Sequence, residues 1–573
     1  MDFSKNSRTA ARVIGAAVWF LAIVAAPVFA QQQKPDAGSV LEQLKQPPVE
    51  PQRSPDVVPR APEPRPALGA PGLKLIVKGF KISGNTLYAE SVLTAQVQEF
   101  VGKEQTIDGL NDAATKVRAY YRERGYFLSQ AYLPQQEIKD GVIEIAVIEA
   151  RVGKVAVNFK EGTRYSESLV RGIVNAHLKE GELITETGLE TPLLLLNDFP
   201  NGVVTSEIKP SQTVGAADLT VNISDSDGWI SGSVDVDNYG NRFTGAIRTG
   251  ISLSVANPFA LGDQLTYRGF TTDDKMGFYR MAYTMPVGYW GTRVGISYAS
   301  FHYRLGKQFL DNLTHGTGGV TSIYAFHPLI RTRSSNLIVQ YAYEQKRLDD
   351  RNEVNLTITD QNIVASKIGV VGDFRDGVFG GGLNSYGYTI TEGSADFSGT
   401  IPDPTVVGRF AKHNFEFRRL QKITDNTTLL LALQGQMGSK NLTSAERFSL
   451  GGPSGVRAYP TGEALGDTGW IFQAEMRYIV PNLKIANADV TLSGFWDQGW
   501  VRLQENFVAP AAGLTAASAN NRRLSGYGLG GSIGKDSDFV LRASVAWRNE
   551  NEPAQSDTTP RVPRVWVQGI KWF

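Results

Sequence analysis

The segment Ala488-Asp489-Val490-Thr491-Leu492-Ser493-Gly494-Phe495-Trp496-Asp497 alternates between two kinds of side chain. Its even-numbered positions are apolar or small, whereas its odd-numbered positions are mostly polar. Because successive side chains of a β-strand point to opposite faces, the pattern predicts one face toward lipid and one toward a polar interior. Asp497 then points inward. Phe495 interrupts the polar row, so its ring needs a cover other than water.

The same alternation replaces helical periodicity from Trp229 to Phe573. Sixteen candidate strands lie in this part of the chain. Each is close to the roughly 9–11 residues that a tilted membrane β-strand needs, and an even number closes a bacterial barrel. We therefore predict a mainly β fold in which residues 229–573 form a 16-stranded transmembrane β-barrel. A soluble β-sandwich or propeller is the alternative.

An export signal favours the membrane barrel. Arg8 and Arg12 precede an apolar run that ends at Val28-Phe29-Ala30, which predicts a signal peptide over residues 1–30. No later stretch reaches the roughly 18 apolar residues of a spanning helix, so a membrane role falls to strands. The chain has no cysteine, which suits an oxidising compartment, and its 58 basic and 57 acidic residues give no overall charge for nucleic acid.

Residues 31–72 predict a short helix followed by a Pro-rich linker. Val40, Leu41 and Leu44 fall on one face of this helix. So short a helix is marginal alone in water. The segment is therefore either a disordered tail or a tethered helix that docks elsewhere in the molecule.

Residues 73–150 and 151–225 share one predicted order, β-α-α-β-β, and so form an internal repeat. The first copy carries Val77-x-x-Phe80-x-Ile82-x-Gly84-Asn85-Thr86. This motif resembles the POTRA domain, so we expect POTRA 1 at 73–150 and POTRA 2 at 151–225. The resemblance implies periplasmic modules that precede an outer-membrane barrel and dock extended peptides. A spacer role is the alternative, above all for the second copy, whose motif is less clear.

A long insert, residues 437–468, lies between two predicted barrel strands and carries Gly451-Gly452-Pro453-Ser454-Gly455-Val456-Arg457-Ala458-Tyr459-Pro460. The prolines of this tip restrict its backbone, whereas the glycines allow conformations that other residues avoid. The tip carries one fixed cation, Arg457. We predict that the insert folds back into the barrel, where Arg457 meets Asp497 and the loop covers Phe495. Such a pair can be bidentate, and breaking one partner of a buried pair costs about 3–5 kcal/mol.

Val456-Arg457-Ala458-Tyr459, together with Phe495-x-Asp497-x-Gly499, resembles the two-partner secretion transporters (TpsB), the family of haemolysin secretion/activation proteins. Ala458 stands where that family has glycine. The resemblance implies two sets of site residues. The lumenal latch would comprise Arg457, Asp497, Tyr459, Phe495 and Gly499, and the plug helix would present Val40, Leu41 and Leu44.

The resemblance also implies a function. We expect a translocator in the Gram-negative outer membrane, in contact with its lipid, that secretes a large TpsA-like exoprotein in unfolded form. POTRA domains in the periplasm would recognise this haemolysin- or haemagglutinin-like cargo, and the barrel would act as a monomer. The alternative is an assembly factor of the same superfamily that inserts other barrels, although such factors usually carry more POTRA copies. A passive solute porin is disfavoured by the POTRA pair and the filled lumen.

The sequence predicts no enzyme, cofactor, metal site or nucleic-acid partner. Gly526-x-Gly528-x-x-Gly531 resembles a dinucleotide-binding loop, but no βαβ unit surrounds it. We interpret these glycines as small residues of a barrel strand.

Overall fold

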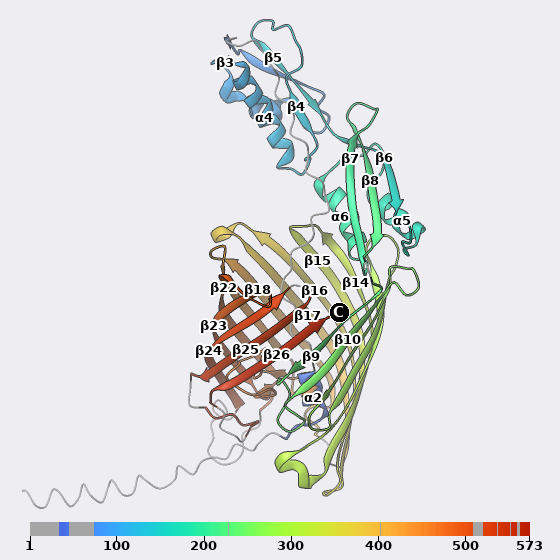
Figure 1. The fold of residues 1–573 in the computed structure, drawn as a ribbon, viewed down its shortest axis with the longest axis vertical. Coiled ribbons are helices and arrows are strands. Elements are labelled where there is room, and N and C mark those ends of the chain that lie inside the picture. Colours follow the sequence, from blue (N-terminus) through green and yellow to red (C-terminus); the bar gives the residue numbers. More distant parts are fainter. Residues whose placement is uncertain are drawn as a thin grey trace, which may run out of the picture.

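The computed structural model describes residues 34–44, 74–226, 228–400, 403–507, 520–535, 537–549, 552–557 and 562–573. Figure 1 shows a β-barrel with two small α+β modules stacked at one of its ends. The predicted signal peptide and nearly all of the Pro-rich linker lie outside the described residues. In the part of the chain that is described, no helix is long and apolar enough to cross a membrane.

Sixteen antiparallel strands form the barrel wall, and five residue pairs between β26 and β9 close it. The predicted 16-stranded barrel is confirmed. The strands are β9 Ile230–Asp237, β10 Arg248–Ala256, β11 Gln264–Thr272, β12 Gly277–Pro286, β13 Arg293–Arg304, β14 Thr314–Arg331, β15 Ser335–Asn352, β16 Thr357–Asp376, β17 Gly382–Gly399, β18 Gly408–Lys422, β19 Thr427–Gly438, β22 Thr468–Ile485, β23 Ala488–Arg502, β24 Asn521–Lys535, β25 Phe539–Arg548 and β26 Arg564–Trp572.

The alternation in β23 separates the two faces of the wall. Asp497 is fully buried, whereas Leu492 and Trp496 on the opposite face are 53% and 36% exposed. Outward apolar side chains of this kind contact lipid. Lys571 of β26 also points outward, and its ammonium reaches Asp538 in the turn between β24 and β25. The charge therefore lies at the rim of the apolar band and not within it.

Strands β14 to β17 are 18–20 residues long, well beyond the prediction of roughly 9–11 residues per strand. In β15 the extra residues keep the inward and outward alternation, but Arg347 and Arg351 are exposed on the outer face. These ends therefore extend past the lipid. The prediction was too short because it used outward apolar residues to mark the strand, and those stop where the lipid stops.

Each module is a three-stranded sheet covered by helices, with a core of its own. Module 1 contains β1 Lys74–Ile76, β2 Gly79–Ser83, α3 Glu90–Ala95, η1 Gln98–Phe100, β3 Glu104–Thr106, α4 Ile107–Arg122, β4 Gln130–Tyr132 and β5 Val142–Ile148. Module 2 contains β6 Arg151–Phe159, α5 Glu167–His177, α6 Glu186–Asn197, β7 Gly202–Pro210 and β8 Ala216–Asp225. The sheet orders are β2-β5-β4 and β6-β8-β7.

Module 2 is joined to the barrel by side chains as well as by the chain itself. Arg331 at the end of β14 binds Asp198, just after α6, with a closest N–O distance of 2.6 Å. Arg333 in the following turn binds Glu186 of α6 at 2.9 Å and also pairs with Glu190. These contacts fix α6 over one side of the barrel mouth.

Two separate apolar clusters lie inside the barrel. One involves β13, β15, β16, β17 and β18 and contains Phe301, Leu348, Ile363, Ala395 and Phe410. The other involves β22 to β25 and contains Ile471, Phe495, Val501, Leu524 and Ala546. Apolar side chains that face a lumen need a cover, and each cluster is covered by a different segment of the chain.

Candidate functional site: a loop and a helix inside the barrel

The lumenal loop, residues 439–467, folds back between β19 and β22 into the barrel. Its short elements are η4 Ser444–Glu446, β20 Phe448–Ser449 and β21 Leu465–Gly466. Leu450, Val456 and Tyr459 of the loop have no exposed surface and belong to the cluster on β22–β25. Gly499 of β23 leaves room for them, since a Cβ there would lie 3.3 Å from Val456 Cγ2. The loop therefore covers this half of the wall.

The tip of the lumenal loop holds Arg457 against Asp497. Nε and Nη2 of Arg457 donate to the two carboxylate oxygens at 2.8 and 2.7 Å, and its backbone N–H adds a bond of 3.1 Å. The Asp497 side chain is 0% exposed and that of Arg457 is 11% exposed. A bidentate pair in so little solvent is geometrically specific, and losing one partner strands a buried charge.

The Arg457 guanidinium also covers the ring of Phe495, two residues before Asp497 in β23. Arg457 Cζ lies 3.4 Å from the ring centroid, well within range of a cation–π interaction. The sequence predicts that the loop covers Phe495, and the part of the loop that covers the ring is the side chain of Arg457. Tyr459 is fully buried, and its hydroxyl donates to the backbone carbonyl of Glu552 at 3.2 Å.

Two glycines of β24 make space for the tip. A Cβ on Gly526 would come within 2.4 Å of the Ala458 Cβ, and one on Gly528 within 2.3 Å of the Phe495 ring. Real Cβ atoms do not approach other atoms so closely, so a side chain at Gly526 would displace the tip and one at Gly528 would displace the Phe495 ring. In the glycine pattern that resembles a dinucleotide-binding loop, Gly526 and Gly528 therefore leave space for Ala458 and Phe495.

Sequence reasoning missed several charged partners of the lumenal loop. Glu475 of β22 accepts a hydrogen bond from Nη1 of Arg457 at 2.5 Å. Elsewhere in the loop, the fully buried Glu463 accepts from Nη1 of Arg522 in β24 at 2.5 Å. Strand alternation does place Glu475 and Arg522 on the inner face. It does not say which loop charge arrives there, because that depends on the path of the loop.

The short helix α2 Ala37–Gln43 lies inside the barrel, toward the end away from the modules (Figure 1). A capping box begins it: Asp36 accepts from the backbone N–H of Ser39 at 2.8 Å, and the Ser39 side chain accepts from the Asp36 N–H at 2.9 Å. The backbone N–H of Ala37 donates to the carboxylate of Asp350 in β15 at 2.9 Å. The helix is thus attached to the wall at its first residue.

The face predicted from the spacing of apolar residues is the face that packs. Val40 is 1% exposed, and Leu41 and Leu44 are partly buried against the cluster of β13 and β15–β18. This burial supplies the host surface that so short a helix needs. In this structure residues 36–44 are therefore a docked segment and not a disordered tail.

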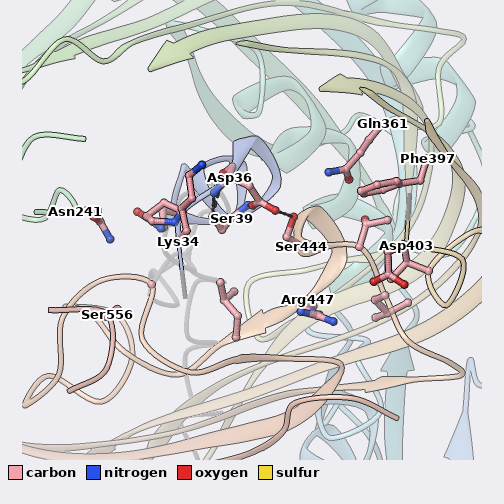
Figure 2. A pocket seen from close by; sticks show the side chains of 17 residues that line it. Lys34, Asp36, Ser39, Asn241, Gln361, Phe397, Asp403, Ser444, Arg447 and Ser556 are labelled. Carbon is pink, nitrogen blue, oxygen red and sulfur yellow. Dashed lines mark hydrogen bonds between the residues drawn. The ribbon is translucent and has the colours of Figure 1, made fainter. Parts of the chain in front are cut away.

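A cavity of about 190 Å³ lies beside the first turn of α2, between the helix, the lumenal loop and the wall. Figure 2 shows Lys34 and Asp36 on one side of this cavity and Arg447 on another, with a hydrogen bond from Ser444 to Asp36. Such a volume holds a few water molecules, each of which occupies about 30 Å³, but no polypeptide chain. The helix and the loop therefore lie against each other and against the wall on the sides of this cavity.

A closed membrane barrel, two segments that fill its lumen and two modules at one mouth together define an outer-membrane protein transporter. Two family profiles match the chain: the ShlB-type POTRA domain over residues 75–150, and the haemolysin secretion/activation proteins ShlB/FhaC/HecB over residues 215–523. The second match covers more than half of the 573 residues. This chain belongs to the ShlB/FhaC/HecB family, which confirms the resemblance, the outer-membrane location and the periplasmic position of the modules.

Individual relatives cover most of the chain. The heme/hemopexin transporter protein HuxB of Haemophilus influenzae is 26% identical, over 94% of this chain and 95% of its own. The solved structure of CdiB from Escherichia coli, 20% identical, covers 89% of this chain and 93% of its own, with a TM-score of 0.68. BamA from Haemophilus ducreyi, solved without POTRA domains 1–3, matches with a TM-score of 0.51 at 13% identity, over 87% of this chain and 100% of its own. These structures share the fold.

Proposed function

We propose that this transporter threads one large secreted partner protein, unfolded, through its barrel. The observation that carries the proposal is the composition of the lumen: α2 and the lumenal loop fill it, and neither is a strand of the wall. Withdrawal of these segments would open a channel while the strand ladder stays intact. A single chain closes the barrel, so we propose that the monomer is the working unit.

We further propose that the modules recognise the cargo. An extended chain can add a strand to an exposed sheet edge, with specificity supplied by side-chain pockets beside it. Strand β7 supports this role because it lies at the edge of its sheet and pairs with β8 along nine residues. Val203 near its start is 43% exposed and offers an apolar contact.

Calorimetry with purified residues 74–226 tests recognition, since each module has a core of its own. The ligand is the N-terminal region of a large secreted β-repeat protein encoded beside this chain's gene. We expect roughly micromolar binding, because ordering the cargo offsets part of the contact energy, and no binding of an unrelated unfolded protein. Val203→Glu should weaken binding, whereas Val214→Glu, at an 89% exposed position in the β7–β8 turn, is the matched control.

A second experiment distinguishes a role in secretion from the alternative function, which is the assembly of other barrels. Deleting the gene should remove one protein from the culture medium and leave the outer-membrane barrels at normal abundance. A general loss of barrels would instead establish an assembly factor. Equal binding of the modules to cargo and control would move recognition to the barrel.

A further inference from the structure

A buried ion-pair cluster anchors the lumenal loop at a point remote from Arg457. Glu446 of η4 is 1% exposed, and its carboxylate meets Lys346 Nζ of β15 at 2.5 Å and Lys412 Nζ of β18 at 2.8 Å. Its backbone carbonyl accepts from Lys412 at 2.9 Å and from Gln436 Nε2 of β19 at 2.8 Å. Both lysine side chains are nearly buried, at 6% and 4% exposure.

The same short element is the surface on which α2 rests. Gly38 faces η4 so closely that a Cβ would lie 2.1 Å from Ser444 Oγ and 2.5 Å from the Ala445 backbone nitrogen. Ser444 Oγ donates to Asp36 Oδ2 at 2.8 Å, as Figure 2 shows. Ala445 has no exposed surface and belongs to the same apolar cluster as Val40. The helix therefore packs against the residues immediately before Glu446.

The charges explain why η4 stays in place. The cluster contains Lys346, Lys367 and Lys412, which form ion pairs with Glu446 and Glu344. Glu42 of α2 also interacts electrostatically with Lys346. Glu446 comes from the loop, whereas Glu344 belongs to the wall strand β15. If η4 moves away, the wall keeps its ammonium groups but loses a carboxylate, and buried charges without a partner are costly.

We propose that Glu446 is a positioning residue that holds η4 against β15 and β18 and thereby keeps α2 in the lumen. Opening of the transporter then requires this cluster to separate, independently of the contact between Arg457 and Asp497. The inference rests on the proposal that α2 occludes the channel. Its test measures the position of the helix and not secretion, so either idea can fail without the other.

The natural absence of cysteine allows a direct test in the full-length barrel. Val40→Cys places a thiol at a buried position of α2, and a membrane-impermeant maleimide reports its exposure in proteoliposomes. Glu446→Gln keeps the side-chain shape but removes the charge, and we expect labelling to become about tenfold faster. Gly38→Val should accelerate labelling from the helix side, because a side chain at that position meets Ser444 and Ala445.

Two further variants distinguish positioning from general loosening of the barrel. Glu344→Gln removes a negative charge from the same cluster, but Glu344 pairs with wall lysines and not with η4. We expect its labelling to stay within about twofold of the parent. Adding Lys346→Met to Glu446→Gln should slow labelling again, since removing both partners of a buried pair costs less than removing one.

Each variant is first shown to be a folded barrel by its heat-dependent mobility on gels. Unchanged labelling in folded Glu446→Gln would overturn the proposal, as would an equal acceleration by Glu344→Gln or no slowing by Lys346→Met. If Glu446→Gln does not fold, the double variant and Gly38→Val still test the proposal. A thiol at position 40 that stays protected in Gly38→Val would mean that η4 does not hold the helix.

Discussion

Ala458 at the tip of the lumenal loop rests on the bare backbone of Gly526, where an added Cβ would lie 2.4 Å from its own. The two residues are far apart in the sequence, and each constrains the other. The loop motif that this segment resembles has glycine at the position of Ala458. The extra methyl group is accommodated here because the facing position of β24 carries no side chain.

Gly526→Ala should therefore lift the loop tip and reduce secretion strongly, while the barrel still assembles. The added methyl group collides with a residue that Val456 and Tyr459 hold in a buried turn. Gly494→Ala is the matched control, since a Cβ there meets Leu529 at an ordinary 3.8 Å. Secreted cargo is measured by immunoblot at equal barrel abundance. Equal secretion by both variants would show that the tip tolerates displacement.

Loss of the ion pair at the tip should have a similar outcome by a different route. Arg457→Ala leaves Asp497 buried without this cation, at a cost of about 3–5 kcal/mol, whereas Asp497→Ala leaves Arg457 with Glu475. In both variants secretion should fall strongly with the barrel still inserted. Arg457→Lys should rescue only in part, because an ammonium cannot make the bidentate bond. Normal export by both alanine variants at matched barrel levels would contradict a role of the pair in secretion.

Strand alternation was sufficient to predict the wall. In β23 it places Asp497 inside and Trp496 outside, and both positions agree with the structure. It failed at the outer ends of β14–β17, because polar residues beyond the lipid no longer mark the outward face. A local pattern reports the solvent on each side of a strand, so it loses its meaning where water lies on both sides.

The contacts that anchor the loop were less predictable. A bonded pair such as Lys346 and Glu446 is 100 positions apart, and its members meet only because the loop takes one particular path. Gly528 illustrates the same limit, since its role follows from where the Phe495 ring lies in the adjacent strand. The residue type at one position limits the interactions that its side chain can make. Which residue becomes its partner is decided by the tertiary fold.

Removing α2 should raise the conductance of the barrel. Deletion of residues 37–44 takes away the helix that covers the apolar wall of β13–β18, and ions then pass beside the remaining loop. Single-channel recording in planar bilayers measures the change. A deletion of equal length in the Pro-rich linker, residues 52–59, is the control. Identical conductance of both deletions would mean that α2 does not restrict the channel.

The turn in module 1 that carries Gly84 and Thr86 is held by a carboxylate at the end of the repeat. Glu149 accepts from the backbone N–H groups of Thr86 and Leu87, both at 2.9 Å, and from the Tyr121 hydroxyl at 2.8 Å. Gly84 has φ +78°, and a Cβ there would lie 2.2 Å from a backbone carbonyl of β5. The motif that resembles POTRA thus builds a binding site for Glu149.

This carboxylate makes the stability of module 1 dependent on pH. Burial by itself would raise the pKa of Glu149, but the hydrogen bonds from Thr86, Leu87 and Tyr121 outweigh it and lower the pKa below 4.5. The folded state therefore binds the proton more weakly than the unfolded state. The stabilisation is present above about pH 4.5 and is lost as the pH falls through the folded value.

Glu149→Gln should accordingly destabilise residues 74–226 by about 1–3 kcal/mol at pH 7, because it weakens hydrogen bonds to a charged acceptor. The difference from the parent should shrink as the pH is lowered from about 4.5, since protonation removes the same charge from the parent. Urea unfolding at a series of pH values measures both quantities. Glu137→Gln, with a side chain 87% exposed in the same module, is the control and should leave the curve unchanged. A difference between Glu149→Gln and the parent that stays constant from pH 7 to pH 3 would contradict the assignment, because it would place the lost stability in packing and not in charge.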